Sequence, residues 1–280
     1  MTATKPAAEP VEQFVDAGGV RTRYLEAGTG SHTVVLLHGS GPGVSAWANW
    51  RLIIPALAQD FHVVAPEMAG YGASRGATDI RYGIATWVDH MLAFLDRLDV
   101  RRASFVGNSM GGLISLHIAI RCPERVHRMV LMGAPGVGMR PTDGLTAVRN
   151  YEPSLDNMRD LLTHWFAYDP SIITDDLVEA RYQASTDGDA HEIYRAMFHD
   201  PRHNGNDLLL DEDAVRGITA PTLLVHGLHD KVVPVETSWT MLRLLPNAQL
   251  HVFHRSGHWT QIEHPTEFSR LVTNHLDRAT

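Results

Sequence analysis

A serine flanked by glycines, in the run Gly107-Asn108-Ser109-Met110-Gly111, is the feature that most constrains the fold of this chain. A strand-like segment (103–106) leads into the run, and a helix-like segment (110–121) leads out of it. A serine on a sharp turn from strand to helix has an exposed hydroxyl, and glycines two positions away on either side let the backbone turn without a Cβ clash. The pattern therefore predicts that Ser109 is a nucleophile at the end of a strand.

A second match to the same pattern, Gly72-Ala73-Ser74-Arg75-Gly76, lacks this context. No strand-like segment precedes it and no apolar helical segment follows it, whereas the motif requires strand, turn and helix together. We therefore interpret Ser74 as a loop serine.

Short runs rich in β-branched residues alternate with longer amphipathic runs along much of the chain. Apolar residues recur at helical spacing between Ile84 and Leu98, for example. This alternation predicts an α/β fold, with a mostly parallel sheet covered on both faces and functional groups at the carboxyl ends of its strands. The expected strands are Val20–Glu26, Thr33–Leu37, His62–Ala65, Ala103–Val106, Arg128–Leu131, Thr222–Val225 and Gln249–Phe253.

The alternation stops in the middle of the chain, where three helical patterns follow one another without a strand between them (155–166, 175–184 and 190–198). A helical block inserted into such a sheet is typical of a cap that buries a substrate and excludes water. The alternative is a helical decoration with no part in catalysis. The predicted division is a core domain built from residues 1–136 and 214–280, with a helical cap formed by residues 137–213 inserted between them.

Composition narrows the possible partners and location. A formal net charge of −8 argues against nucleic acid or an anionic membrane surface as a partner. The single cysteine, Cys122, excludes an internal disulfide and is typical of a reducing compartment, so we expect a cytoplasmic protein. No apolar run approaches the ~20 residues of a membrane span, and the first residues lack the apolar segment of a signal peptide.

A serine hydroxyl is a poor nucleophile unless a base takes its proton, and in this kind of fold Asp and then His follow the serine along the chain. Asp230 comes just after an expected strand, and His258 lies in the loop after the next one. Asp211 and Asp213 belong to an acidic stretch typical of a solvated face, and His251 lies within a strand. Their positions just after strand ends therefore favour His258 as the base and Asp230 as the carboxylate that holds it.

The run His38-Gly39-Ser40-Gly41-Pro42-Gly43 follows an expected strand. A backbone N–H group of this run, expected at Ser40, and the N–H of Met110 could together form an oxyanion hole with two donors. The run contains neither GxxxxGK[ST] nor GxGxxG, the two glycine-rich motifs that bind phosphate groups. His226 and His229 flank a strand-end turn rather than sharing a helix face, so we predict no metal site.

With these residues in place, the chain resembles the meta-cleavage product hydrolases of aromatic-ring degradation, within the α/β-hydrolase superfamily. The cap stretch further resembles the branch that acts on small-substituent ring-fission products. One departure is Glu67, where relatives are expected to carry aspartate; we interpret it as structural. The resemblance covers about Gly30 to Leu276 and is carried by residues 38–50, 107–112, 168–177, 181–185 and 256–264.

The resemblance implies hydrolysis of a C–C bond in 2-hydroxy-6-oxohexa-2,4-dienoates, the products of extradiol ring cleavage. It also implies a small-molecule substrate, no cofactor, and a homo-oligomer with a dimer favoured. Arg181 is the residue assigned to the substrate carboxylate and the adjacent dienol oxygen, because a planar guanidinium can grip two oxygens. Asn108, Asn49, Gly41 and Trp259 are the other expected substrate-binding residues.

Two other functions stay open at this point. A carboxylesterase or lactonase of the same fold would use Ser109, Asp230 and His258 but would not need Arg181. A non-catalytic ligand receptor of this fold would tolerate the loss of Ser109.

The sequence leaves two features of the chemistry open. Ser109 could attack the substrate directly or assist a water molecule to form a gem-diol. The preferred substituent at C6 is not readable either, and we expect Trp165, Phe166, Met158 and Phe198 to line that side of the pocket.

Overall fold

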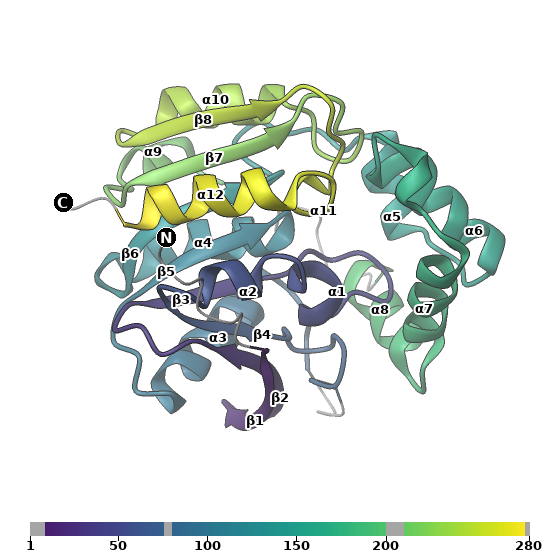
Figure 1. The fold of residues 1–280 in the computed structure, drawn as a ribbon, viewed down its shortest axis with the longest axis horizontal. Coiled ribbons are helices and arrows are strands. Elements are labelled where there is room, and N and C mark those ends of the chain that lie inside the picture. Colours follow the sequence, from purple (N-terminus) through teal and green to yellow (C-terminus); the bar gives the residue numbers. More distant parts are fainter. Residues whose placement is uncertain (1–8, 76–79, 200–209, 278–280) are drawn as a thin grey trace, which may run out of the picture.

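The computed structural model describes residues 9–75, 80–199 and 210–277 (Figure 1). An eight-stranded sheet in the order β1-β2-β4-β3-β5-β6-β7-β8 forms its centre. All pairings from β4 to β8 are parallel, and β2 runs antiparallel to both of its neighbours. The strands are β1 (Val11–Ala17), β2 (Val20–Ala27), β3 (Thr33–Leu37), β4 (His62–Pro66), β5 (Ala103–Asn108), β6 (Val126–Met132), β7 (Thr222–Gly227) and β8 (Ala248–Phe253).

Helices cover both faces of the sheet, which confirms the predicted α/β fold (Figure 1). Helices α3 (Ile84–Arg97), α4 (Met110–Arg121), α9 (Glu212–Arg216) and α10 (Glu236–Leu244) pack in one core cluster. Helices α1 (Ala46–Trp50), α2 (Ile54–Leu57) and α12 (Pro265–Leu276) pack in the other, and α11 (Thr260–Glu263) precedes α12. A single 3-10 turn, η1 (Pro123–Arg125), joins α4 to β6.

The apolar residues at helical spacing in α3 form its buried face. Trp87, Met91 and Leu95 lie in the first core cluster, against side chains of the sheet. Burial of a large apolar side chain contributes about 1.5–3 kcal/mol relative to exposure. The pattern in the sequence is therefore what fixes this helix on the sheet.

The helices that follow β6, up to His199, pack around a core of their own, at the right of Figure 1. They are α5 (Asp143–Arg149), α6 (Leu155–Asp160), η2 (Leu161–Phe166, a π-helix), η3 (Pro170–Ile172, a 3-10 turn), α7 (Asp175–Thr186) and α8 (Ala190–His199). Residues 200–209, which fall within the predicted cap, lie outside the described residues. The core of this block continues into Val232, Val233 and Trp259, so it sits directly on the segments that follow β7 and β8.

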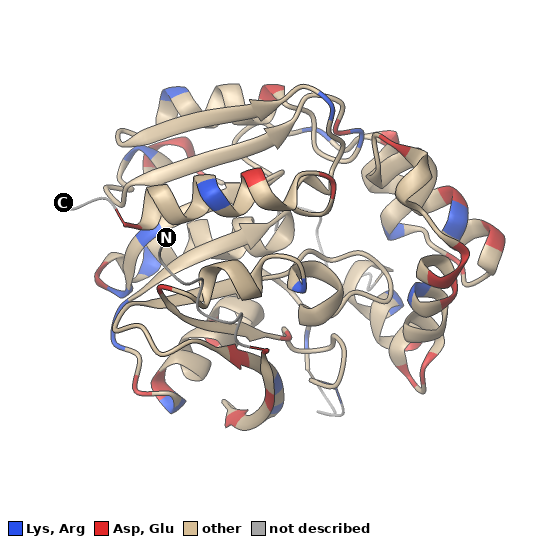
Figure 2. Ribbon diagram, in the orientation of Figure 1, with Lys and Arg blue, Asp and Glu red and all other residues tan. Residues whose placement is uncertain are grey.

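Charged residues are distributed over the ends and outer faces of the helices (Figure 2). Acidic positions are prominent on the outer side of α6 and α7, in keeping with the net charge of −8. Within the described ranges, no helix has both the length and the apolar character needed to cross a bilayer.

Candidate active site

Ser109 stands on a strained turn between β5 and α4. Its backbone has φ +50° and ψ −114°, a conformation that L-residues rarely adopt, and its N–H donates to the Met132 carbonyl at 2.8 Å. The flanking glycines are required by close packing. A Cβ on Gly107 would lie 2.4 Å from the backbone of α4, and one on Gly111 would lie 2.2 Å from a carbonyl oxygen of β3. The predicted turn is therefore present, and such strain typically costs about 1–3 kcal/mol.

Asp230 and His258 form a buried pair at the ends of neighbouring strands. His258 Nδ1 lies 2.7 Å from Asp230 Oδ2, while Asp230 Oδ1 accepts from the N–H groups of Val232 and Val233 at 2.8 and 2.9 Å. Burial alone would raise the pKa of Asp230, but His258 and His226 outweigh it and hold that pKa well below its ordinary value. The carboxylate is thus ionised and able to stabilise a protonated imidazole.

The nucleophile, the base and the proposed substrate groups line one cavity. It holds about 370 Å³ of space between atoms, including space open to solvent. The cavity brings together every residue predicted to bind substrate. Its lining is Gly39, Ser40, Gly41, Val44, Asn49, Asn108, Ser109, Leu145, Val148, Phe166, Arg181, Val232, His258 and Trp259.

The loop after β3 is held against the nucleophile from both sides. A Cβ on Gly39 would lie 3.5 Å from the Cβ of Ser109, and the N–H of Gly39 donates to Asn49 Oδ1 at 3.3 Å. His38 Nε2 accepts from the N–H of Met68 at 3.1 Å, so its Nδ1 carries the proton and donates to the Gly39 carbonyl at 2.7 Å. Burial lowers the pKa of His38 to about 4, which keeps this ring neutral.

This loop and the start of α4 bring the two predicted oxyanion-hole residues to the same cavity or its edge. Ser40 follows the anchored Gly39 and lines the cavity beside Ser109. Met110 is the first residue of α4, where the N–H groups of a helix have no intrahelical partner. Two preorganised donors at such positions can stabilise an oxyanion on the carbon that Ser109 attacks.

Arg181 is a buried cation on α7 that points at the same cavity. Its side chain is only 5% exposed, and burial lowers its pKa to about 10. The guanidinium donates to the Pro42 carbonyl at 2.7 Å and lies 5.6 Å from the centre of the Trp259 ring. Its Nε has no hydrogen-bond partner, and no carboxylate within the described residues lies within 4.0 Å of its nitrogens. A buried charge left without a counter-charge is costly unless a ligand supplies one.

The smaller predicted substrate groups surround this cation. A Cβ on Gly41 would lie 3.3 Å from the Arg181 guanidinium, so glycine there leaves the guanidinium accessible. Asn49 Nδ2 is buried without a partner, which leaves it able to donate to a bound molecule. Asn108 Nδ2 makes only a long, 3.5 Å contact with the Met132 carbonyl. The amide nitrogens of Asn49 and Asn108 at this end of the cavity are therefore donors that lack a strong acceptor.

Comparison with known proteins relates this geometry to a family. Residues 34–271 match the Alpha/beta hydrolase family. The chain is 48% identical over 267 residues to a 2-hydroxy-6-oxo-2,4-heptadienoate hydrolase of Pseudomonas putida F1, covering 95% of this chain and 96% of that protein. It is 47% identical over 264 residues to a 2-hydroxymuconate semialdehyde hydrolase of Pseudomonas sp. CF600, covering 94% and 93% of the two chains. The chain belongs to the meta-cleavage product hydrolases of the α/β-hydrolase family.

A solved structure agrees with this assignment. The meta-cleavage product hydrolase CumD of Pseudomonas fluorescens IP01, a serine-to-alanine variant complexed with acetates, superimposes with a TM-score of 0.92 at 44% identity. The alignment covers 96% of this chain and 98% of that one. The resemblance seen in the sequence motifs is confirmed, and the protein is a serine-dependent hydrolase.

Sequence reasoning missed the apolar end of this hydrolase's cavity. Leu145 and Val148 of α5 and Val232 after β7 line it, whereas the predicted set was Trp165, Phe166, Met158 and Phe198. Of that set Phe166 lines the cavity, and Met158 is fully buried within the separate core of the helical block. The helical pattern of α5 could have indicated a buried face, but not that this face meets the turn after β7.

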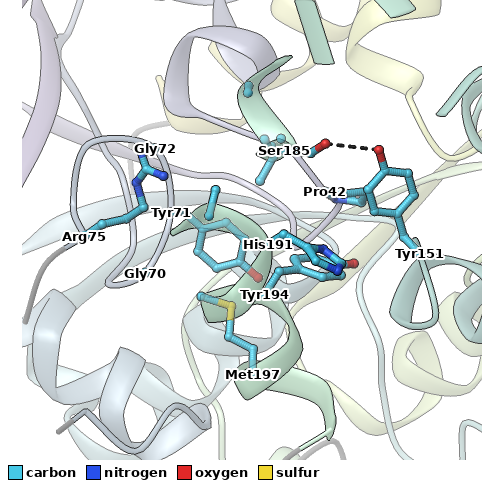
Figure 3. A pocket seen from close by; sticks show the side chains of 14 residues that line it. Pro42, Gly70, Tyr71, Gly72, Arg75, Tyr151, Ser185, His191, Tyr194 and Met197 are labelled. Carbon is cyan, nitrogen blue, oxygen red and sulfur yellow. Dashed lines mark hydrogen bonds between the residues drawn. The ribbon is translucent and has the colours of Figure 1, made fainter. Parts of the chain in front are cut away.

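Figure 3 shows a second cavity, which holds about 390 Å³ of space between atoms, including space open to solvent. It shares Val44 with the active-site cavity and is lined by Tyr71, Tyr151, Ser185 and Tyr194 among others. Tyr151 and Ser185 are hydrogen-bonded to each other at 3.0 Å, as the dashed line in Figure 3 marks. Ser109, Asp230 and His258 do not line this cavity.

Two residues interpreted as structural in the sequence are structural in the fold. Ser74 lies in a turn, and its hydroxyl accepts from the Arg23 N–H at 2.9 Å. Glu67 is fully buried, pairs with the Arg23 guanidinium at 2.6 Å and accepts from the Ala73 N–H at 2.7 Å. Neither side chain lines the active-site cavity.

Glu263 joins the loop that carries the base to the helical block. One carboxylate oxygen accepts from the Gly257 N–H at 2.7 Å and the Ser256 hydroxyl at 3.1 Å. The other accepts from the N–H groups of Tyr168 and Asp169 at 2.7 and 3.2 Å. Four donors from two regions of the chain therefore converge on one side chain.

Replacing Glu263 with glutamine is expected to lower the free energy of unfolding by about 1–3 kcal/mol, because an amide nitrogen cannot accept and leaves donors unpaired. Urea denaturation measures the change. Glu267→Gln, on the exposed start of α12, is the matched control and should change stability by less than about 0.5 kcal/mol. Equal effects of the two variants would contradict the bridging role.

Proposed function

We propose that this enzyme hydrolyses the bond between C5 and C6 of 2-hydroxy-6-oxohexa-2,4-dienoates that carry a small substituent at C6. The products are 2-hydroxypenta-2,4-dienoate and a carboxylic acid. One observation carries the proposal: the buried Arg181 guanidinium, without a carboxylate partner among the described residues, lines the same cavity as Ser109. An ester hydrolase has no need of such a group, whereas the dienoate has a carboxylate and a neighbouring oxygen that a guanidinium can bind in a fork.

The relatives support a small substituent. One is named for a 6-oxoheptadienoate, which carries a methyl group at C6, and another for a semialdehyde, which carries hydrogen there. The apolar lining formed by Leu145, Val148 and Val232 suits such a group once Arg181 holds the carboxylate.

The first step prepares the C–C bond for cleavage. Moving the proton of the C2 hydroxyl to C5 turns the dienol into a ketone, with a double bond left between C3 and C4. Arg181 and the amide groups of Asn49 and Asn108 are placed to stabilise charge on the C1 and C2 oxygens. The C2 ketone can then accept the electrons of the bond that breaks.

The second step uses the nucleophile and its base. His258 takes the proton of Ser109, whose oxygen attacks C6, and the N–H groups of Ser40 and Met110 stabilise the resulting oxyanion. Collapse breaks the C5–C6 bond and its electrons move to the C2 oxygen, which takes up a proton as His258 gives up the one it received from Ser109. The dienol product departs and an acyl group stays on Ser109. Water activated by His258 then releases the acid. General-base help of this kind typically contributes ~10²–10⁴-fold.

A direct assay tests the proposal. Ring-fission products of this class are yellow, so turnover of 2-hydroxy-6-oxohepta-2,4-dienoate removes visible absorbance. We expect fast decay with stoichiometric release of acetate and 2-hydroxypenta-2,4-dienoate, identified by chromatography. Absence of decay with the 6-hydrogen, 6-methyl and 6-phenyl substrates, together with rapid hydrolysis of aryl esters, would instead indicate a carboxylesterase.

We also propose that the helical block closes the site as a cap. The support is its contact with the base: the Phe166 carbonyl accepts from the His258 N–H at 2.8 Å, and the Phe166 ring lies 5.0 Å from the Trp259 ring. The segment that surrounds the substrate thus also holds the catalytic loop in place.

Shortening Val148 should shift the substrate preference toward a larger C6 substituent. Val148→Ala is expected to raise the ratio of kcat/KM for the 6-phenyl over the 6-methyl substrate by about 10-fold, because a pocket discriminates by about 1–3 kcal/mol for each methylene. Steady-state kinetics on both substrates measures the ratio. Val178→Ala is the matched control, since Val178 is buried in the same apolar core but does not line the cavity. An unchanged ratio in Val148→Ala would contradict the assigned orientation.

A further inference from the structure

His226 lies at the end of β7, fully buried beside the catalytic acid. Its Nε2 is 2.8 Å from the Val233 carbonyl oxygen and 3.3 Å from Asp230 Oδ2. Its Nδ1 is 2.7 Å from the hydroxyl oxygen of Ser238 on α10. The mechanism described above does not use this histidine.

The contacts of the ring define its tautomer. A carbonyl oxygen and a carboxylate oxygen can only accept, so Nε2 must carry a proton. In the neutral ring Nδ1 then accepts from the Ser238 hydroxyl. The Val233 carbonyl and the Asp230 carboxylate therefore select the tautomer in which Nε2 carries the proton, and Ser238 supplies the donor that Nδ1 needs.

We propose that His226 is a positioning residue for the catalytic acid, acting through Asp230 on His258. This inference rests on the proposed role of Asp230 and His258 in activating Ser109. The oxygen that binds His258, Asp230 Oδ2, has His226 as a second imidazole donor, while backbone N–H groups occupy the other oxygen. The backbone donors fix one oxygen, and the His226 Nε2–H, 3.3 Å from Oδ2, adds a contact from protein that keeps the other oxygen in place while His258 gains and loses its proton.

The same imidazole also fixes the turn that carries the acid. Val233 donates its N–H to Asp230 and receives the His226 proton on its carbonyl. The turn is therefore tied to β7 through His226 and to α10 through Ser238. A side chain without a donor at this place would leave the Val233 carbonyl unpaired and the Asp230 carboxylate with one fewer donor.

The test compares two replacements of similar size. His226→Leu removes the donor, whereas His226→Gln can place an amide N–H near the position of Nε2. We expect His226→Leu to lower kcat for the 6-methyl dienoate about 10- to 100-fold with KM changed less than about 2-fold, and His226→Gln to restore kcat to within about 5-fold of wild type. Ser238→Ala should lower kcat by a few-fold, because the buried Nδ1 then lacks its donor and the ring loses its contact with α10.

A second readout does not depend on the dienoate. A fluorophosphonate reacts when Ser109 attacks phosphorus: the O–P bond forms, fluoride leaves, and the serine proton passes to His258. The rate at which this probe labels Ser109 can be followed by the intact mass of the protein. It should fall most in His226→Leu and less in His226→Gln. His90→Leu is the matched control, because His90 is a buried histidine that bonds Thr22 and Ala69 away from the site. It should lower stability and leave the labelling rate unchanged.

The outcomes separate the two proposals. Equal labelling rates for wild type and a folded His226→Leu would overturn the positioning role, as would equal losses in the Leu and Gln variants. Slower labelling of His226→Leu, rescued by glutamine, would support that role even if no dienoate is turned over, in which case only the proposed substrate is wrong.

Discussion

Arg181→Ala is expected to lower kcat/KM for 2-hydroxy-6-oxohepta-2,4-dienoate by about 10²- to 10³-fold, while hydrolysis of a neutral aryl ester changes less than about 3-fold. Truncating one partner of a buried, hydrogen-bonded charge pair costs about 2–5 kcal/mol, or about 30- to 5,000-fold, and the expected range lies within these limits. The ester has no carboxylate for the guanidinium, so its turnover depends only on Ser109, His258 and the oxyanion donors. Steady-state kinetics on the two substrates measures the contrast.

Two further variants make the Arg181 prediction sharper. Arg181→Lys keeps the charge but loses the planar fork, so its kcat/KM should fall between those of wild type and alanine. Arg181→Met removes a buried cation that has no counter-charge among the described residues, and its melting temperature without substrate should not fall. A parallel loss of ester and dienoate hydrolysis, or a marked loss of stability in Arg181→Met, would assign the residue a structural role.

Most of the parallel region of the sheet could be predicted from the sequence because β3 to β7 are buried on both faces. Thr33–Leu37, for example, is a continuous apolar run with the predicted bounds. The edge strand β1 (Val11–Ala17) was not predicted. Its side chains are mostly exposed and include several polar residues, so the alternation of a half-buried strand is missing. Pairing with β2 stabilises this segment, and its own sequence pattern does not indicate it.

The segment 155–166 shows where local pattern and tertiary structure diverge. The sequence predicts one helix, but the structure has α6 followed by the π-helix η2, and the Ala167 N–H donates to the Leu162 carbonyl at 3.0 Å. This wider turn ends at Phe166, whose carbonyl accepts from the His258 N–H. A π-turn often accompanies a functional site, and here it meets the catalytic loop. Periodicity within the segment carries no information about that contact.

In the candidate site, too, some residues could be predicted from the sequence and others could not. Ser109, Asp230 and His258 could be predicted because each follows a strand in a fixed order along the chain. His226 and Glu263 could not, because their roles depend on Ser238 and on Tyr168, which are distant in sequence or in a separate block. Residues that act through other residues leave little trace in a local motif.

Ser109→Ala is expected to lower kcat for the 6-methyl dienoate by about 10⁴- to 10⁶-fold, the range seen when a serine nucleophile is removed from such a set. Substrate binding should persist, since Arg181 and the two asparagines are untouched. Absorbance of the bound dienoate, recorded in a stopped-flow instrument, should therefore change on mixing although no acetate is released. Acetate release at more than a hundredth of the wild-type rate would show that Ser109 is not the nucleophile.

The same position should also show that catalysis is achieved at the expense of stability. At φ +50° the backbone strain of a non-glycine residue costs about 1–3 kcal/mol, and Ser109→Gly removes this strain. The greater backbone entropy that glycine loses on folding opposes the gain by about 0.5–1 kcal/mol. We therefore expect the inactive Ser109→Gly protein to be more stable than wild type by about 1 kcal/mol in urea denaturation. Ser115→Gly is the matched control within α4, where glycine should lower stability by a similar amount. Lower stability in both variants would mean that the turn at Ser109 stores no strain.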